Sequence, residues 1–223
     1  MIAETVRRHL TNGMFVSFAI VIALIAIGVS QYGQPGSAWP GFAVLLAVVT
    51  GAGVIGPEFS SGTLQLILVK PINRAVYLLS RVAGVVLLVW SVSAIAALCE
   101  IAGRALDGEV PWSLIGTALV NSMGDTLLVC ALLALFGTFT RAYFNVALYF
   151  ALQLTLALLV GLARRKFTPA IAQAVVAVEQ NLFPDTPPRF DAEWLLLVAS
   201  NAAIALVLAS FIFRRREVPY GAE

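Results

Sequence analysis

Long apolar runs separated by short polar segments dominate the sequence of this 223-residue chain. A helix that crosses about 30 Å of hydrocarbon needs about 20 apolar residues. A membrane β-barrel would instead need strands of alternating polarity, which the sequence lacks. The pattern therefore predicts an all-α membrane protein. Six transmembrane helices are expected, at residues 14–30, 40–55, 82–103, 113–139, 142–163 and 193–213.

Composition indicates that lipid rather than water surrounds these helices. Hydrophobic residues make up 60% of the chain and charged residues only 12%, whereas a soluble domain carries about 25% charged residues. Membrane lipids are therefore expected partners. The small net charge of +2 gives no indication of nucleic-acid binding.

The distribution of Lys and Arg predicts the orientation. With the N-terminus in the cytosol, nine of the 14 basic residues lie on the cytosolic side and five lie outside. Cytosolic loops carry the excess of basic residues in most membrane proteins, so both termini are expected in the cytosol. The basic run Arg164, Arg165 and Lys166 departs from this rule because it falls outside.

The N-terminal segment, residues 1–13, has an amphipathic pattern. Ile2, Val6 and Leu10 share one helical face, and charged residues lie elsewhere on the wheel. This spacing predicts a short helix in the inner membrane interface. The simpler interpretation is an ordinary basic flank of the first span.

A second amphipathic segment, residues 164–192, precedes the last span. Thr168 is a candidate N-cap and Pro169 a candidate first helical residue, and apolar residues then recur on one face. We expect a short helix on the outer surface, or a re-entrant helical hairpin. The last residues, 214–223, are expected to form a basic cytosolic tail.

Two polar residues fall within the predicted span 113–139. Asp125 lies near its middle, and Asn121 precedes it by one helical turn on the same face. A charged Asp at the bilayer centre costs about 2.5–3.5 kcal/mol on insertion scales, so it should face protein or water. Either the pair lines a candidate translocation path and binds a cationic part of a substrate, or Asp125 is protonated or hydrogen-bonded and joins helices or protomers.

Other polar residues in the spans predict packing rather than chemistry. Glu100 and Arg104 are four residues apart and predict an ion pair along one helix. Neither a metal site nor a disulfide is expected, because His9 is the single histidine and both cysteines, Cys99 and Cys130, fall inside spans. Three amides are expected to hydrogen-bond between helices: Asn145, Gln153 and Asn201.

A punctuated segment, GPEFSSGTLQLILVKPINR, joins the second and third predicted spans on the expected cytosolic side. Pro57 and Pro71 bracket a Leu-rich run. The run either rests on the headgroups as part of a basic loop, or forms a rigid apolar projection that inserts into a groove on a soluble partner. Asn73 is the predicted N-cap of the next helix, which would carry Arg74 and Arg81 in the cytosol or headgroups before it enters the membrane.

The order of residues in this segment resembles the cytosolic loop after the second span of permeases of the ABC transporter type-2 family. That loop has an acidic residue, a Gly-Thr pair, a Leu-rich run, and then a proline and a basic residue. The N-terminal helix, the six spans, the helical insertion before the last span and the basic C-terminal end resemble the layout of the same family. The matching residues, which the resemblance implies take part in coupling to the ATPase, are Glu58, Gly62, Thr63, Leu64, Leu66, Ile67, Leu68, Lys70 and Arg74. Of these, the run from Leu64 to Lys70 would press into the ATPase groove.

The resemblance implies a permease subunit that works with a second, identical or homologous, protomer and two cytosolic ABC ATPase subunits. It also implies a prokaryotic plasma membrane and, for most of the family, export. Residues 56–81 would be the coupling loop between residues 14–55, with two spans, and residues 82–163, with three. The sequence has no GxxxxGK[ST] phosphate loop. The chain itself is therefore not expected to be an enzyme or to bind a cofactor, and ATP and Mg would bind to the partner ATPase.

Two other functional classes remain. An intramembrane hydrolase needs a nucleophile and a base, or metal ligands, that converge at membrane depth, and Glu100 and Asp125 are expected at different depths. A non-transporting scaffold or assembly factor is compatible with the composition. A co-purifying ABC ATPase would distinguish a permease from both.

Overall fold

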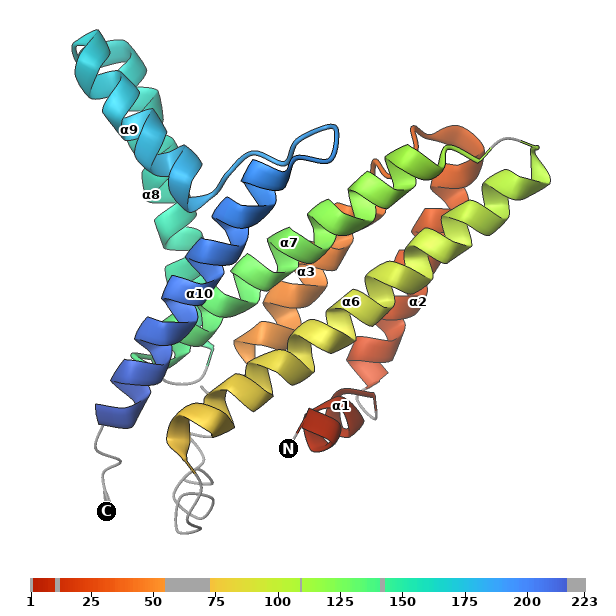
Figure 1. Ribbon diagram of the computed structural model, residues 1–223, viewed down its shortest axis with the longest axis horizontal. Coiled ribbons are helices and arrows are strands. Elements are labelled where there is room, and N and C mark those ends of the chain that lie inside the picture. The colour runs from red at the N-terminus through yellow and green to blue at the C-terminus, as the bar shows by residue number, and fades with distance from the viewer. Residues whose placement is uncertain (1, 11–12, 55–72, 109, 141–142, 216–223) are drawn as a thin grey trace.

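The chain folds into a bundle of helices (Figure 1). The structure, a computed structural model, describes residues 2–10, 13–54, 73–108, 110–140 and 143–215, and these contain helices and no strand. Three of the helices are α1 (Ile2–Leu10), α3 (Trp39–Ala52) and α9 (Pro169–Leu182). Five more are long and apolar enough to cross a membrane: α2 (Gly13–Tyr32), α6 (Arg74–Leu106), α7 (Trp112–Gly137), α8 (Phe144–Lys166) and α10 (Ala192–Arg215). The prediction of an all-α, multi-pass membrane protein is confirmed.

The remaining predicted span, residues 40–55, coincides with the shorter helix α3. Its 14 residues extend about 21 Å at 1.5 Å per residue. This length is less than the thickness of the hydrocarbon core, which is about 30 Å. The residues from 55 onward lie outside the described part of the chain. A sixth span therefore stays a prediction.

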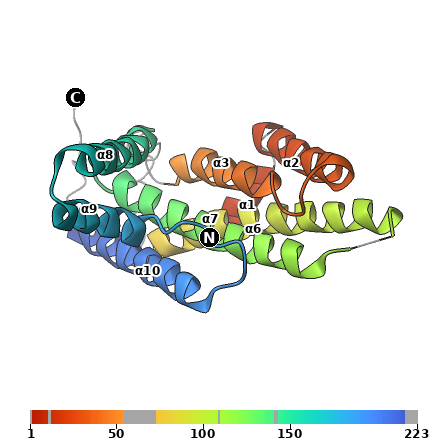
Figure 2. The same ribbon diagram turned by 90° about the horizontal axis from the view of Figure 1, so that it is seen from above.

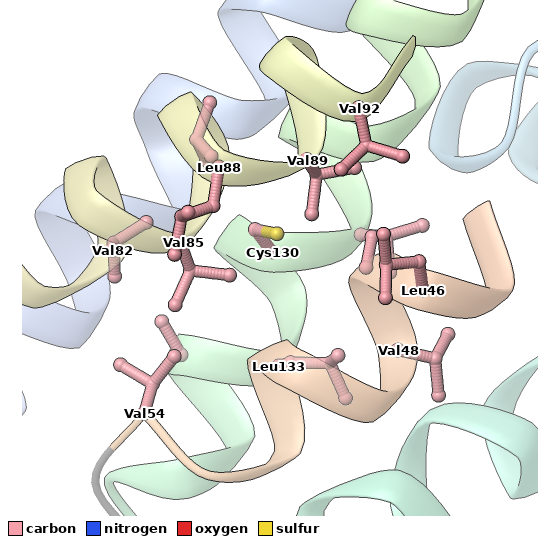
Figure 3. Packing of buried hydrophobic residues seen from close by; sticks show 14 of the residues in the cluster. Leu46, Val48, Val54, Val82, Val85, Leu88, Val89, Val92, Cys130 and Leu133 are labelled. Carbon is pink, nitrogen blue, oxygen red and sulfur yellow. The ribbon is translucent and has the colours of Figure 1, made fainter. Parts of the chain in front are cut away.

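Helices α3, α6 and α7 form the centre of the bundle, because each packs against the other two. Helix α2 covers α6 and α3 on one side, and α10 covers α7 and α6 on the other (Figures 1 and 2). A Cβ atom on Gly51 would lie 2.9 Å from Leu133 Cδ1, so the small residue lets α3 approach α7 closely. The apolar side chains packed among α3, α6 and α7 include Leu46, Val48, Val85, Val89, Cys130 and Leu133 (Figure 3).

Helices α8 and α9 form a helical hairpin that diverges from the bundle (Figure 1). Helix α9 begins at Pro169 as predicted, although the Thr168 side chain makes no capping hydrogen bond. Ile171 and Val175 of α9 and Leu156 of α8 line an apolar groove of about 430 Å³ between the two helices. The apolar face of α9 therefore packs toward α8, and its place relative to the membrane stays a prediction.

The two ends of the bundle differ in what they carry. The end that carries α1, the last turn of α3, the first turn of α6 and the last turn of α10 is called the inner end here (Figure 1). The opposite end, with the loop from α2 to α3, is called the outer end. The predicted orientation places the inner end in the cytosol.

At the inner end, α1 packs against α6 and buries Arg81. The Arg81 side chain is only 8% exposed, its Nη1 donates a hydrogen bond to Thr5 Oγ1 at 3.1 Å, and its guanidinium lies 5.9 Å from the Tyr77 ring centre. Helix α1 therefore folds over Arg81 at the inner end, and the place of Arg81 in the cytosol or headgroups stays a prediction. Helix α1 directs Thr5 toward α6, whereas Ile2 is 41% exposed.

The start of α6 agrees with its predicted cap. Asn73 Oδ1 accepts a hydrogen bond from the backbone N–H of Ala75 at 3.0 Å, which satisfies one of the free N–H groups at the start of a helix. Helix α6 thus begins at Arg74, eight residues before the predicted entry into the membrane.

Candidate functional site

Asn121 and Asp125 lie near the middle of the central helix α7. They are four residues apart, which places their Cβ atoms about 5–6 Å from each other on one face. Asn121 is 4% exposed and Asp125 is partly buried. Helix α7 holds them firmly, because it packs against α3, α6, α8 and α10.

The connector between α9 and α10 crosses α7 at this point (Figure 1). Thr186 Oγ1 donates a hydrogen bond to Asp125 Oδ2 at 3.1 Å, and Asn121 Nδ2 donates one to the backbone oxygen of Pro187 at 2.7 Å. Asp125 is therefore hydrogen-bonded, as one interpretation of the sequence expects, but it joins α7 to a connector and not to another helix.

The same two side chains also line a recess. Its volume is about 510 Å³, within the range of about 300–1,000 Å³ typical of small-molecule sites. Its walls come from the α2–α3 loop, from α3, from α7 and from the α9–α10 connector. Polar lining residues are Gln34, Ser37, Thr117, Asn121, Ser122, Asp125 and Thr186, and apolar ones include Pro35, Val44, Leu114, Ala118, Pro187 and Pro188.

The buried carboxylate of Glu100 holds the wall of this recess in place. Glu100 is 0% exposed and accepts hydrogen bonds from Gly36 N at 3.0 Å, from Trp39 Nε1 at 2.7 Å and from Arg104 Nε at 3.0 Å. The predicted ion pair of Glu100 with Arg104 is confirmed. Arg104 also donates to the backbone oxygen of Gly33 at 2.9 Å, so one buried charge pair fixes the α2–α3 loop to α6.

Gly36 is the residue in that loop that tolerates no side chain. Its φ of +67° lies in the left-handed region, which favours glycine. A Cβ atom there would also lie 2.4 Å from the Cβ of Ala118 on α7. The loop therefore lies directly against α7 beside the recess.

The predicted coupling segment can be followed only at its end. Arg74 begins α6 at the inner end of the bundle. The other residues predicted to take part in coupling to an ATPase lie outside the described part of the chain: Glu58, Gly62, Thr63, Leu64, Leu66, Ile67, Leu68 and Lys70.

Of the three amides predicted to hydrogen-bond between helices, two do so. Asn145 Nδ2 of α8 donates to the backbone oxygens of Ala52 and Leu133, each at 3.3 Å, and Asn201 of α10 donates to the backbone oxygen of Asn181 in α9. For Gln153 the prediction is wrong, because Nε2 donates to Tyr149 Oη on its own helix at 2.8 Å.

Several lining residues were missed from the sequence. No role was predicted for the α2–α3 loop or for the α9–α10 connector, yet Gln34 and Ser37 of the loop and Thr186 of the connector line the recess. The available signal is the sequence Thr-Pro-Pro at 186–188. Prolines fix φ and lack an N–H, so they interrupt regular backbone hydrogen bonding here, and the Pro187 carbonyl accepts a hydrogen bond from the Asn121 side chain.

The recess offers hydrogen-bonding groups, among them the side chains of Asn121 and Asp125. Among the described residues no group of three or more His, Cys, Asp or Glu side chains could hold a metal ion. Within the same residues Cys99 and Cys130 are both free thiols. The sequence matches no protein-family model and no curated protein.

Proposed function

We propose that this chain is the transmembrane permease subunit of an ATP-driven transporter of the ABC type-2 kind, in the plasma membrane of a prokaryote. In this proposal α3, extended beyond Ala52, is the second of six spans, and both termini are cytosolic. A separate ATPase docks on the coupling loop at residues 56–81, and transport is export.

One observation carries the proposal. The segment with the permease-like motif joins α3 to α6, and both of these helices pack along α7, which bears Asn121 and Asp125 at the recess. An ATPase that displaced this segment would therefore move α3 and α6. Both helices contact α7, which forms the central wall of the recess. Packed helices transmit such displacements because their interfaces are not continuously deformable.

Two further features agree with a subunit of a larger assembly. The sequence has no phosphate loop of its own, so the energy of ATP must come from another polypeptide. Helices α2, α8 and α10 leave large apolar side chains exposed, among them Leu24, Leu154 and Val207. These faces suit lipid contact or a second protomer.

Co-purification tests the proposal directly. The tagged chain is isolated from its own host in mild detergent, as wild type, as a Leu66→Asp, Ile67→Asp double variant, and as an Ile2→Asp control. Ile2 is an exposed apolar residue on α1, also at the inner end. Mass spectrometry then identifies and quantifies the co-purified proteins.

We expect a stoichiometric ABC ATPase with the wild type and the Ile2→Asp control, and its loss from the double variant, because a charged group in the apolar contact is left desolvated and unpaired. Isolation of the folded wild type without any ATPase would refute the permease function. A scaffold or assembly factor would then be the better description of the chain.

A further inference from the structure

We propose that the recess binds a small organic cation that carries N–H donors and an apolar body. This inference rests on the proposed function in so far as the cation is the transported substrate. Binding itself requires no ATPase, because all of the groups described below belong to this chain.

The charge of the recess selects a cation. Asp125 is the one charged side chain among the described residues that line it. The nearby acid Glu100 is not available to a ligand, because it is fully buried and paired with Arg104. Since no lining Lys or Arg balances the Asp125 carboxylate, a positively charged ligand is the complementary partner.

The hydrogen-bonding capacity of the recess selects a donor. Asn121 is only 4% exposed. Its Nδ2 donates a hydrogen bond to the Pro187 carbonyl, whereas its Oδ1 has no hydrogen-bond partner in the described chain. Buried acceptors without a partner are rare and call for an explanation. Asp125 has one donor, Thr186, and retains free acceptor positions. An ammonium or amino group in the recess would bind the free acceptor positions of Asp125.

The remaining walls suit an apolar body. Leu114, Ala118 and Val44 contribute apolar surface from α7 and α3, and prolines contribute the rest. With a volume of about 510 Å³, the recess has the size typical of small-molecule sites. Inorganic cations are poorly matched, because they prefer a closed shell of oxygen ligands.

Binding of a fluorescent cation tests the inference. Ethidium is a permanent cation with two aryl amino groups, and phenanthridine is its uncharged parent ring without amino groups. Both are titrated against the purified full chain in nanodiscs of zwitterionic lipid, with empty nanodiscs subtracted. The variants are Asp125→Asn and the control Asp185→Asn, which removes the same charge from an exposed residue of the same connector that does not line the recess.

We expect ethidium to bind the wild type and the Asp185→Asn control with equal affinity, and to bind Asp125→Asn at least tenfold more weakly. Phenanthridine should bind the wild type at least tenfold more weakly than ethidium does. A charge-assisted hydrogen bond accounts for a factor of this size. Equal affinity of the two Asn variants, or tighter binding of phenanthridine than of ethidium, would overturn the inference.

A second pair of variants covers the case in which Asp125→Asn does not fold. Thr117→Phe places a ring in the recess, whereas Gly116→Phe places the same ring in open space on the adjacent position of α7. If ethidium binding is lost in Thr117→Phe and kept in Gly116→Phe, the result supports the site. Equal binding by the two variants refutes it. Co-purification of an ATPase without cation binding would overturn this inference and leave the permease function standing. Cation binding by a chain that co-purifies without an ATPase would support this inference and refute the permease function.

Discussion

Replacing Trp39 with Phe tests whether Glu100 is held as a charged acceptor. Trp39 is 0% exposed and its Nε1 lies 2.7 Å from Glu100 Oε2. Phe keeps an aromatic ring at the position but has no N–H to donate. A hydrogen bond to a charged group contributes about 1.5–3 kcal/mol, against about 0.5–1.5 kcal/mol for a neutral pair. We therefore expect the free energy of unfolding to fall by about 2 kcal/mol or slightly more.

Trp90 supplies the matched control. Its Nε1 donates at 3.0 Å to the neutral backbone oxygen of Met123, so Trp90→Phe removes the same atoms and should cost about 1 kcal/mol. Both variants are unfolded reversibly by denaturing detergent in mixed micelles, and the midpoints are converted to free energies. Because Trp39 is more deeply buried, part of its loss comes from the space left by the smaller ring.

A double-mutant cycle with Glu100→Gln separates the two contributions. If the hydrogen bond to the carboxylate causes the loss, Trp39→Phe and Glu100→Gln should couple by about 1–2 kcal/mol, since residues in direct contact are not additive. Additive losses in the cycle, or a Trp90→Phe loss as large as that of Trp39→Phe, would refute the assignment of Glu100 as a charged anchor for the α2–α3 loop.

Two other contacts have definite expected outcomes. Gly36→Ala should lower the free energy of unfolding by about 1–3 kcal/mol, because of its positive φ and its approach to Ala118. Gly41→Ala, which meets no atom within 4 Å, should be neutral or slightly stabilising, and the same detergent titration compares them. Thr5→Val removes the acceptor of the Arg81 hydrogen bond, so amide hydrogen exchange in α1 should become several-fold faster, and unchanged exchange would show that this bond does not hold α1 on α6.

The spanning helices could be predicted from the sequence because lipid imposes a length on every apolar run. The predicted spans 113–139 and 142–163, for example, correspond to α7 (Trp112–Gly137) and α8 (Phe144–Lys166). Local chemistry also gave the start of α6, since an Asn side chain caps a helix through contacts within three residues. These features depend on neighbours along the chain.

Contacts between distant segments could not be predicted in the same way. The sequence predicts that Arg81 lies in the cytosol or headgroups and gives no sign that it is buried. Its burial depends on α1, whose Thr5 lies 76 positions earlier. The recess similarly brings Gln34 and Thr186 to the helix that carries Asp125. Hydrophobic periodicity records which face of a helix is apolar, but it does not record which loop crosses that face.

The carboxylates of Glu100 and Asp125 show what the structure adds to the distinction between an anchor and a binding group. In the sequence, each is the single acid of an apolar helix, and Glu100 has a basic partner, Arg104, one turn away. In the structure, Glu100 accepts hydrogen bonds from a backbone amide, an indole and a guanidinium, whereas Asp125 accepts one from a hydroxyl within the described chain. A buried charge with a full set of donors stabilises one conformation, because any movement would leave it unpaired. The carboxylate with unused acceptor positions, beside the unpartnered amide oxygen of Asn121, is the one that can still gain free energy from a ligand.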